Sequence, residues 1–585
     1  MRHSASSISL RLSELLTRDL TPSVDLRVGL FSLGMALCWL TPNHFMPWSS
    51  FDGDFGMALV MAMLAWSVWI TTSSCWSVPR LAVAAFALAL VPLFQFGVGL
   101  VYYAGEAWIF SSALMGFGLA VSAGSMLPRK SISVVDAVLT AALCASIVSV
   151  GIQLWQWLSL SSTSEFSGLG LWLMNLPLGA RPFANLAQPN QLSTLLLWGL
   201  AGAWWLFVRH RIGNATALLV AVYLLFGLAM TQSRSGWIGL SAMAVMAWMY
   251  RRPLGSIRHA GAVLALLVFF VGLTIAWSAI NDALYLSAAE SLENRLSGGA
   301  RLLNWKNCLS ALMQRPWAGF GWGQVAVAQQ AALLSHPASG EYFAYAHNIV
   351  LDMLLWNGIP LGSLIVMSFA IWLAGRLRRV ASAEGAVLAM AIVVLLIHAL
   401  LEYPHAYFYF LLPMGLMLGA LGTIVPGTRT MTVPHLLVGS LLAAVTILIA
   451  WVAHDYLKAS ANMEQLRFES ARIGTSRDSQ PPDILLLTQL REYLATSRIN
   501  VHEPVDAATL ERLGRTARRY ASDSTLFRYA MSAAISGRPE VAADTLRRLC
   551  WLHAREGCES VRAAWREEAQ TKHPEMAAIL RQVER

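Results

Sequence analysis

The sequence predicts an all-α polytopic membrane protein that carries a long external loop and a water-soluble helical tail. Of the 585 residues, 56% are hydrophobic and 13% are charged, whereas about 25% of the residues in an average soluble domain are charged. A chain with so many apolar residues needs lipid around most of its surface, which excludes a disordered protein, a soluble enzyme and a coiled coil. The formal charge is +9, but the basic residues form short clusters between apolar runs. That placement is typical of membrane topology and not of nucleic-acid binding.

About thirteen apolar runs have the length and composition of membrane-spanning helices. They lie near residues 28–41, 56–75, 81–100, 107–124, 135–158, 192–208, 214–231, 235–250, 259–279, 358–375, 385–401, 406–424 and 434–454. Basic residues cluster at alternate junctions, beginning with the N-terminal segment, so the positive-inside rule places the N-terminus in the cytoplasm. An odd number of spans then places the C-terminal segment outside. No small-residue cleavage site follows the first run, and we expect a retained helix there.

The apolar runs and the polar segments between them divide the chain into four parts. These are an N-terminal membrane domain at 1–279, a large external loop at 280–346, C-terminal membrane helices at 347–454 and an external helical tail at 455–585. Residues 524–550 have apolar side chains at helical spacing around a Gly-Arg-Pro turn, which predicts a helical hairpin similar to one tetratricopeptide unit. Cys550 and Cys558 also lie in the tail. An external compartment permits a disulfide, and the sequence leaves their pairing open.

Polar residues at membrane depth are costly, and they indicate cavities or binding sites. Four such clusters lie at the outer ends of the predicted spans. The first, GARPFANLAQPNQLS, contains Arg181, Gln188 and Asn190. Its amides either bind a sugar or an acceptor backbone, or satisfy a polar turn of their own. The second, TQSRSG, contains Arg234, which suits bidentate phosphate binding or, as the plainer alternative, contact with a lipid headgroup.

The third cluster is the external loop. There Arg301 belongs to a second cationic group, and the Gly-Trp-rich stretch at 315–324 offers aromatic faces on which sugars often stack. His347 follows this stretch. A lone histidine is more often structural than catalytic, but this one lies on the external side beside an apolar helix, which makes it a candidate general base.

The fourth cluster, at residues 398–410, holds Glu402, Tyr403 and Tyr407. The glutamate would orient a catalytic histidine or bind an arginine, and the tyrosines are alternatively an interfacial aromatic belt. Common catalytic motifs do not occur in the sequence, which has no Walker A loop, GxSxG elbow, HExxH pair or repeated Cys/His metal spacing.

Several segments, in their order along the chain, resemble the bacterial O-antigen ligase and polymerase superfamily. These are NLAQPNQ (185–191), SRSG (233–236), PWAGFGWGQ (316–324), HN (347–348) and NGIPLG (357–362). Within that superfamily, four segments and the helical tail resemble the protein O-oligosaccharyltransferases, also called pilin glycosylation ligases. These segments are NHFMPW (43–48), VPLFQFGVGLVYYAGEA (91–107), LAQPN (186–190) and EYPHAYFYFLLPMG (402–415). His405 and Ala406 depart from a Leu-Trp pair that is frequent among the relatives.

The resemblance implies a reaction and its location. The donor would be a glycan on undecaprenyl pyrophosphate, and the acceptor a Ser or Thr hydroxyl of an exported protein such as a pilin. The site would face the periplasm from the bacterial inner membrane, with no metal, no cofactor and no nucleic acid. By position in the family motifs, the essential histidine corresponds to His347, the glutamine of the polar loop to Gln188, the arginines to Arg234 and Arg301, and a functional tyrosine to Tyr403, with Tyr407 as the second candidate.

The residue types suit this chemistry. Pyrophosphate is a good leaving group, so it needs positive charge and not a proton donor. A hydroxyl is a weak nucleophile, so a base must accept its proton during the attack. We therefore assign catalysis to His347, Gln188 and Tyr403, pyrophosphate binding to Arg234, Arg301 and Arg181, and acceptor or sugar contacts to Asn190, Glu402 and Tyr407. One direct displacement would invert the anomeric centre.

Several other functions are alternatives to protein glycosylation. The nearest is an O-antigen ligase that transfers the same glycan to the lipid A core, followed by an O-antigen polymerase. A membrane transporter, from a different class, would show polar residues at mid-membrane and repeated halves, whereas the polar clusters lie at the outer ends and no internal repeat occurs. The DGD triplet at 52–54 fits the acidic motif of metal-dependent membrane glycosyltransferases, but a three-residue match is weak evidence.

Overall fold

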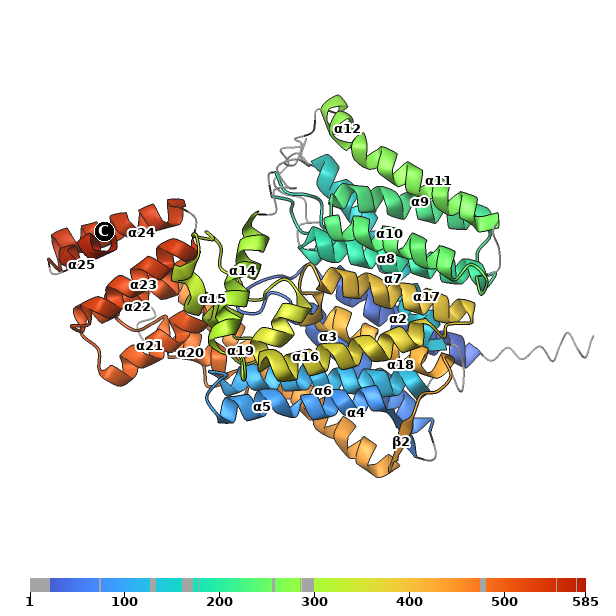
Figure 1. The fold of residues 1–585 in the computed structure, drawn as a ribbon, viewed down its shortest axis with the longest axis horizontal. Coiled ribbons are helices and arrows are strands. Elements are labelled where there is room, and N and C mark those ends of the chain that lie inside the picture. The colour runs from blue at the N-terminus through green and yellow to red at the C-terminus, as the bar shows by residue number, and fades with distance from the viewer. Residues whose placement is uncertain are drawn as a thin grey trace, which may run out of the picture.

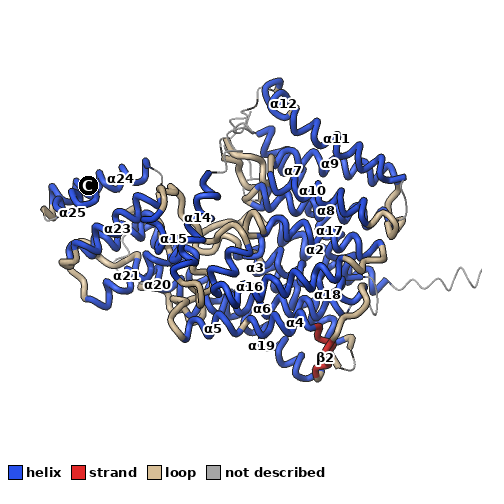
Figure 2. Tube along the Cα trace, in the orientation of Figure 1, coloured by secondary structure: helices blue, strands red, loops and turns tan. Residues whose placement is uncertain are grey.

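The computed structural model describes residues 22–72, 75–126, 133–159, 172–177, 179–254, 258–284, 286, 299–473, 480–553, 555–574 and 576–584. Over these residues the regular secondary structure is helical apart from one small sheet, and loops connect the helices (Figure 2). The predicted class, an all-α polytopic membrane protein, is thereby confirmed. Residues 287–298 of the predicted external loop lie outside the described residues.

The helices of the first half follow the predicted spans. They are α2 (Pro22–Leu40), α3 (Phe51–Ile70), α4 (Arg80–Leu88), α5 (Leu90–Gly97), α6 (Ala104–Met126), α7 (Ser133–Ser159), η3 (Ala184–Leu186), α8 (Pro189–Val208), α9 (Asn214–Thr231), α10 (Arg234–Met249), α11 (Arg258–Ile275) and α12 (Trp277–Ala283).

The second half contains the remaining predicted spans and the tail. Its helices are α14 (Gly299–Gln314), α15 (Val325–Ala332), η4 (Leu333–Ser335), α16 (Ile349–Leu377), α17 (Ala383–Ala399), η5 (Pro404–Ala406), α18 (Phe408–Ile424), α19 (His435–Ser470), α20 (Thr488–Thr496), α21 (Ala507–Arg519), α22 (Asp523–Ile535), α23 (Pro539–Leu552), α24 (Arg555–Thr571) and α25 (Met576–Glu584). Each predicted apolar run coincides with one of these helices or with an adjacent pair.

The predicted count of thirteen spans is not confirmed. Among the described residues, eight helical segments are long and apolar enough to cross a membrane, and the bent pair α11–α12 makes a ninth. The apolar parts of α2, α17 and α18 are shorter. The chain is therefore multi-pass by length and composition, whatever the number of complete crossings.

Close packing of α6 against α18 positions the loop that precedes α18. A Cβ at Gly124 of α6 would meet the backbone of Leu416, and a Cβ at Gly419 of α18 would meet the backbone of Val121. Small residues allow helices in a membrane to approach this closely, since no side chain separates the two backbones. At the end of the bundle away from the tail, β1 (Trp76–Pro79) pairs antiparallel with β2 (Thr430–Val433) (Figure 1).

The loop helices α14 and α15 lie between the helical bundle and the tail (Figure 1). The second half of the Gly-Trp-rich stretch that joins them, residues 319–324, is packed into the interior, whereas Trp317 in the first half is 80% exposed. Trp322 is buried, its indole N–H donates to Asn357 Oδ1 at 2.8 Å, and its ring lies 4.7 Å from that of Trp356. The expectation of an aromatic face for sugars is therefore wrong for Trp322, because the ring faces a core and not a solvent-filled groove.

The long helix α19 leads into the tail, and the short helices α20 to α25 follow it. That helix runs through residue 454 without a break, and the four-part division of the chain stays a prediction. α22 and α23 form the predicted hairpin, with Gly537 in the turn at a φ of +73°, a conformation that glycine adopts without strain. A disulfide joins Cys550 at the end of α23 to Cys558 in α24, which is the pairing that the sequence left open.

A buried ion pair attaches the tail to the bundle. Arg519, the last residue of α21, pairs with Glu106 in the first turn of α6, and the two side chains are 13% and 4% exposed. Glu106 also accepts a hydrogen bond from Gln324 Nε2 at 2.9 Å. Nearby, the Gly105 N–H donates to Thr488 Oγ1 at 2.9 Å. The tail therefore docks beside the loop helices, at the end of the bundle where the predicted polar clusters lie.

Candidate active site

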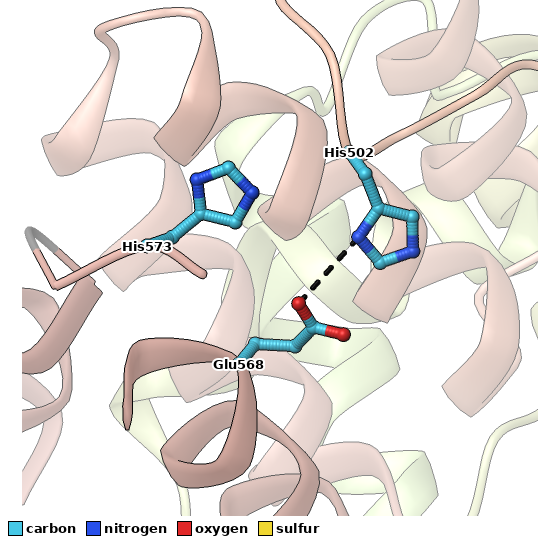
Figure 3. Close-up of side chains that lie close together, drawn as sticks. All are labelled: His502, Glu568 and His573. Atoms are coloured by element: carbon cyan, nitrogen blue, oxygen red, sulfur yellow. Dashed lines mark ion pairs between the residues drawn. The ribbon is translucent and has the colours of Figure 1, made fainter. Parts of the chain in front are cut away.

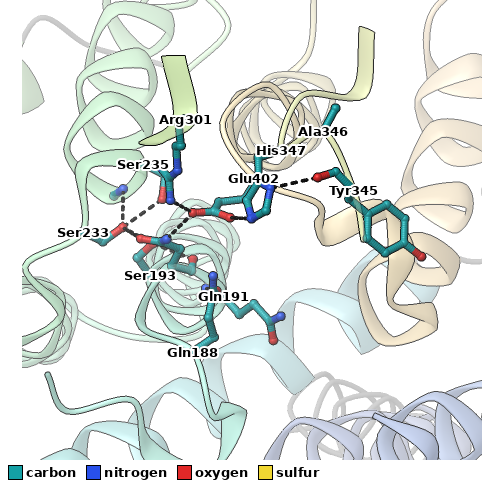
Figure 4. Close-up of polar contacts among 12 residues, drawn as sticks. Gln188, Gln191, Ser193, Ser233, Ser235, Arg301, Tyr345, Ala346, His347 and Glu402 are labelled. Atoms are coloured by element: carbon teal, nitrogen blue, oxygen red, sulfur yellow. Dashed lines mark hydrogen bonds and ion pairs between the residues drawn. The ribbon is translucent and has the colours of Figure 1, made fainter. Parts of the chain in front are cut away.

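Three of the four predicted polar clusters meet directly at the Glu402 carboxylate (Figure 4). Glu402 lies between α17 and η5 and is nearly buried. Its Oε1 atom pairs with Arg301 of α14 and accepts a hydrogen bond from Asn190 Nδ2 of α8 at 2.8 Å. Its Oε2 atom lies 3.5 Å from Nε2 of His347, just before α16. Segments more than 200 residues apart in the sequence therefore contribute to one polar centre.

His347 is held in an unusual backbone conformation. Its φ is +57°, which is uncommon for a residue with a Cβ and is typical of sites where the fold imposes strain. The next residue, Asn348, caps α16 by accepting hydrogen bonds from the backbone N–H groups of Val350 at 2.9 Å and Leu351 at 3.2 Å. The start of α16 thus orients the histidine.

The hydrogen bond of the imidazole selects one tautomer. Nδ1 of His347 lies 3.1 Å from the Tyr345 carbonyl oxygen, and a carbonyl only accepts, so Nδ1 carries the proton. In the neutral ring the lone pair is then on Nε2, the atom that faces Glu402. Burial lowers the pKa of His347, and the charge of Arg301 lowers it further, while the Tyr345 carbonyl opposes this. The ring is therefore neutral at pH 7, with its basic nitrogen directed into the site.

The charges of three arginines act on the same carboxylate, and one of them, Arg301, contacts it directly. Burial raises the pKa of Glu402, and this effect is opposed most strongly by Arg301, then by the amide of Asn190 and by the charges of Arg181 and Arg234. These three arginines are the ones to which the sequence analysis assigned pyrophosphate binding. Three guanidinium groups against one carboxylate leave this set with a net positive charge, which suits an anionic ligand.

The structure fixes two of these arginines by different means. Arg181 donates to the carbonyl oxygens of Thr231 at 3.2 Å and Gln232 at 3.1 Å, in the turn before α10. Arg234 is the first residue of α10 and is exposed, and Ser233 caps that helix. The N-terminus of a helix carries partial positive charge, so it adds to the attraction for an anion.

Amides and hydroxyls connect α8 to the turn before α10. Ser233 Oγ donates to Asn190 Oδ1 at 2.7 Å, so both ends of the Asn190 amide are engaged. Gln188 Oε1 accepts from the Gln191 backbone N–H at 2.9 Å and caps α8. The plainer alternative for this loop, a polar turn that satisfies itself, thus accounts for the oxygen of Gln188. Its Nε2 group takes no part in this cap.

Tyrosine rings line the other side of His347. The rings of Tyr345 and Tyr403 are stacked with centroids 4.8 Å apart, and His347 meets Tyr403 edge-on at 4.8 Å. Tyr407 follows at 5.9 Å from Tyr403. Burial raises the pKa of both Tyr403 and Tyr407, so their hydroxyls remain neutral hydrogen-bonding groups.

One group that supports the histidine was not predicted from the sequence. Asp352 of α16 is fully buried, and its Oδ1 accepts from the Ala346 N–H at 2.8 Å, directly before His347. Its Oδ2 lies 3.4 Å from Nε2 of His405. A single acidic residue inside an apolar run is the signal that would have revealed Asp352, because an unpaired charge there is costly.

The DGD triplet at 52–54 lies in the first turn of α3. Asp54 accepts hydrogen bonds from Ser50 Oγ and from the Phe408 backbone N–H, both at 2.6 Å. This aspartate therefore holds the beginning of α18 in place, a structural role that needs no metal.

A pocket of about 430 Å³ opens beside the histidine, a size in the range of small-molecule sites. It is lined by residues 340–344, His347 and Tyr403, and by Leu552 and His553 from the tail. A ligand in this pocket would therefore contact the basic histidine, the extended part of the loop and the tail together.

Comparisons with known proteins match the segments of the chain that carry this site. The O-antigen ligase family matches residues 219–366, the C-terminal family of virulence factor membrane-bound polymerases matches residues 386–568, and the protein glycosylation ligase family matches residues 182–207. A general O-oligosaccharyltransferase of Acinetobacter baylyi is 29% identical over 539 residues, which cover 89% of this chain and 91% of that protein. A ComP-specific O-oligosaccharyltransferase of the same organism is 32% identical over 256 residues, which cover 43% of this chain and 46% of that protein.

By these matches the chain is similar to the bacterial O-antigen ligase superfamily over two separate parts of its length. Within that superfamily the chain is a relative of the protein O-oligosaccharyltransferases. The family matches include the segments that carry Gln188, Arg234, Arg301, His347 and Glu402.

Proposed function

We propose that the protein is an O-oligosaccharyltransferase that transfers a glycan from undecaprenyl pyrophosphate to Ser or Thr hydroxyls of exported proteins such as a pilin. The observation that carries this proposal is the meeting of three arginines, a neutral histidine and one carboxylate at the end of the bundle where the tail docks. A cationic group suits a diphosphate, and a neutral imidazole suits a hydroxyl acceptor. The match to the protein glycosylation ligase family at residues 182–207 supports a protein acceptor.

In the proposed reaction, the acceptor oxygen bonds to the anomeric carbon while the bond from that carbon to the phosphate oxygen breaks. The hydroxyl proton passes to Nε2 of His347, and undecaprenyl pyrophosphate leaves with the bonding electrons. The imidazolium formed in this step lies 3.5 Å from Glu402 Oε2, so the carboxylate stabilises it. General-base assistance of this kind contributes about 10²- to 10⁴-fold to a rate.

The donor pyrophosphate would lie among Arg181, Arg234 and Arg301. Arg301 is one-third exposed, and it can turn from Glu402 toward a phosphate without leaving its helix. Guanidinium groups bind phosphate oxygens in pairs, and they stabilise the charge that develops on the leaving group. Gln188 Nε2 and the hydroxyls of Tyr403 and Tyr407 are the neutral groups that would orient the sugar and the acceptor.

The acceptor would reach His347 through the pocket lined by the loop and the tail. Residues 340–344 run in a largely non-helical conformation along this pocket, and Leu552 and His553 form its other wall. A tail at the pocket entrance favours a protein acceptor, because a folded protein needs a surface beyond the catalytic groups. The protein would lie in the bacterial inner membrane, with the site and the C-terminus in the periplasm and the N-terminus in the cytoplasm.

An O-antigen ligase that uses the lipid A core as its acceptor is the second candidate, because the O-antigen ligase family matches the segment with Arg234, Arg301 and His347. The two functions share the donor and differ in the acceptor. The protein should be produced in a bacterium without its own ligases, together with a lipid-linked glycan, a pilin and intact lipid A core. Glycan on the pilin that disappears in His347→Ala at equal protein level supports the proposal. Glycan on lipid A alone would instead indicate that the protein is an O-antigen ligase.

A further inference from the structure

A second group of potential ligand atoms lies in the tail, away from the arginines and His347. His502 is in the loop between α20 and α21, Glu568 is in the last turns of α24, and His573 follows the end of that helix (Figure 3). One ligand atom from each residue lies within 4.8 Å of the other two. The group is independent of the proposed glycosyl transfer, since none of its members lines the pocket beside His347.

Glu568 has an oxygen that the described residues leave without a hydrogen bond. Oε2 is buried and has no hydrogen-bond partner, and it lies 3.6 Å from Nδ1 of His502. The other oxygen, Oε1, pairs with Lys572 Nζ at 3.2 Å. A buried carboxylate oxygen without a donor is costly, and a cation between Glu568 and the two imidazoles would remove that cost.

The backbone holds the two halves of the group in place. The His573 N–H donates to the Glu568 carbonyl oxygen at 2.9 Å at the end of α24, which keeps the two side chains adjacent. On the other side, the His502 N–H donates to Asn500 Oδ1 at 3.1 Å, which stabilises the turn that presents His502. The site is therefore formed by two separately ordered segments.

We propose that His502, Glu568 and His573 bind one Zn²⁺ ion. Two imidazoles and a carboxylate favour zinc over magnesium or calcium, which prefer oxygen ligands alone. At zinc–ligand distances of about 2.0–2.1 Å, tetrahedral ligand atoms lie about 3.4 Å apart. The observed spacing, within 4.8 Å, exceeds this by at most about 1.4 Å, and rotation of the half-exposed His502 side chain closes the difference. A water molecule fills the fourth position.

The ion would tie the loop before α21 to the C-terminal helices. α24 is joined to α23 by the Cys550–Cys558 disulfide near its beginning, whereas the zinc site lies at its other end. Zinc binding adds stability by mass action, because the unfolded tail does not present the three ligands together. Its effect should therefore be on the stability of the tail and not on the chemistry at His347.

The test uses the full-length protein in detergent, stripped of metal and titrated with Zn²⁺ against a chromophoric zinc chelator. The expected result is one high-affinity zinc per chain, weakened at least about tenfold by Glu568→Gln or His573→Ala, since even indirect changes at zinc sites cost 10- to 100-fold. His454→Ala is the matched control, because His454 is an exposed histidine of α19 outside the group, and it should bind zinc as the unchanged protein does.

A variant that should bind zinc more tightly distinguishes a loss of ligands from a loss of zinc binding through misfolding. Lys572→Met removes the ammonium group that pairs with Glu568 and lies on an exposed side chain, so it should bind zinc more tightly. Zinc should also raise the melting temperature of the unchanged protein and of His454→Ala, but not that of Glu568→Gln. The proposal is overturned by less than one zinc per chain, by equal affinity in Glu568→Gln and the unchanged protein, or by weaker binding in Lys572→Met.

Discussion

The Glu106→Gln variant should release the tail from the helical bundle, because it leaves a buried guanidinium without its carboxylate. Arg519 and Glu106 are 13% and 4% exposed, so solvent screens their attraction little. Removing one partner of a buried ion pair costs about 3–5 kcal/mol, most of which is the penalty of the charge that remains. Since 1.36 kcal/mol corresponds to tenfold, local opening of the interface should become about 10²- to 10⁴-fold more frequent.

Hydrogen–deuterium exchange of the full-length protein in detergent measures this opening directly. Amides of α21, which ends at Arg519, should exchange faster in Glu106→Gln, and those of α7, which is far from the tail in sequence, should not change. The double variant Glu106→Gln/Arg519→Met should be less destabilised than the sum of the two single variants, since it leaves no unpaired charge.

A matched control is the exposed ion pair in the same tail, Arg512–Glu492, at 3.0 Å with side chains 46% and 24% exposed. Glu492→Gln makes the same chemical change, but exposed pairs contribute only about 0–1 kcal/mol. If exchange in α21 is no faster in Glu106→Gln than in Glu492→Gln, the buried Glu106–Arg519 pair does not hold the tail on the bundle.

Three further predictions concern the site and the metal. The pKa of His347 is lowered, so the ring stays neutral, and able to accept a proton, at pH values below the ordinary histidine pKa of about 6.5. A pH–rate profile of kcat/KM should therefore stay level down to pH 6.5 and fall only at lower pH. A decline centred above pH 6.5 would contradict this. Arg234→Lys should raise the donor KM about tenfold, because lysine loses one phosphate contact; an unchanged donor KM would exclude Arg234 from donor binding. A chelator should lower the melting temperature of the tail but leave the transfer rate unchanged, and a lost rate would indicate a metal in the reaction.

Composition and periodicity predicted most of the fold. The apolar runs gave the positions of the membrane helices, since membrane helices must satisfy their own backbone and therefore read as continuous apolar segments. The breaks inside runs were harder to predict. α4 and α5 separate at Ala89, inside the run predicted at 81–100, and nothing in the apolar pattern distinguishes that break from a straight helix. The break in α16 at Gly358, where φ is +74°, lies instead at the beginning of the run predicted at 358–375.

The site was predictable in its residue types and less so in its contacts. Arg301, His347 and Glu402 stood out because polar groups near apolar helices are costly, and they lie together in the fold. The positive φ of His347 follows from the entry into α16, which a sequence does not display. The Glu106–Arg519 pair joins residues 413 positions apart, and no local pattern identifies which distant charge completes a pair.

In the proposed mechanism, Nε2 of His347 accepts the proton of the acceptor hydroxyl. The most direct measurement is the single-turnover transfer rate of purified enzyme with a defined lipid-linked glycan and a pilin, compared between the unchanged protein and His347→Ala. If His347 is the general base, the rate should be about 10²- to 10⁴-fold lower in the variant at equal protein concentration and saturating donor. A variant rate within about threefold of the unchanged rate would contradict it.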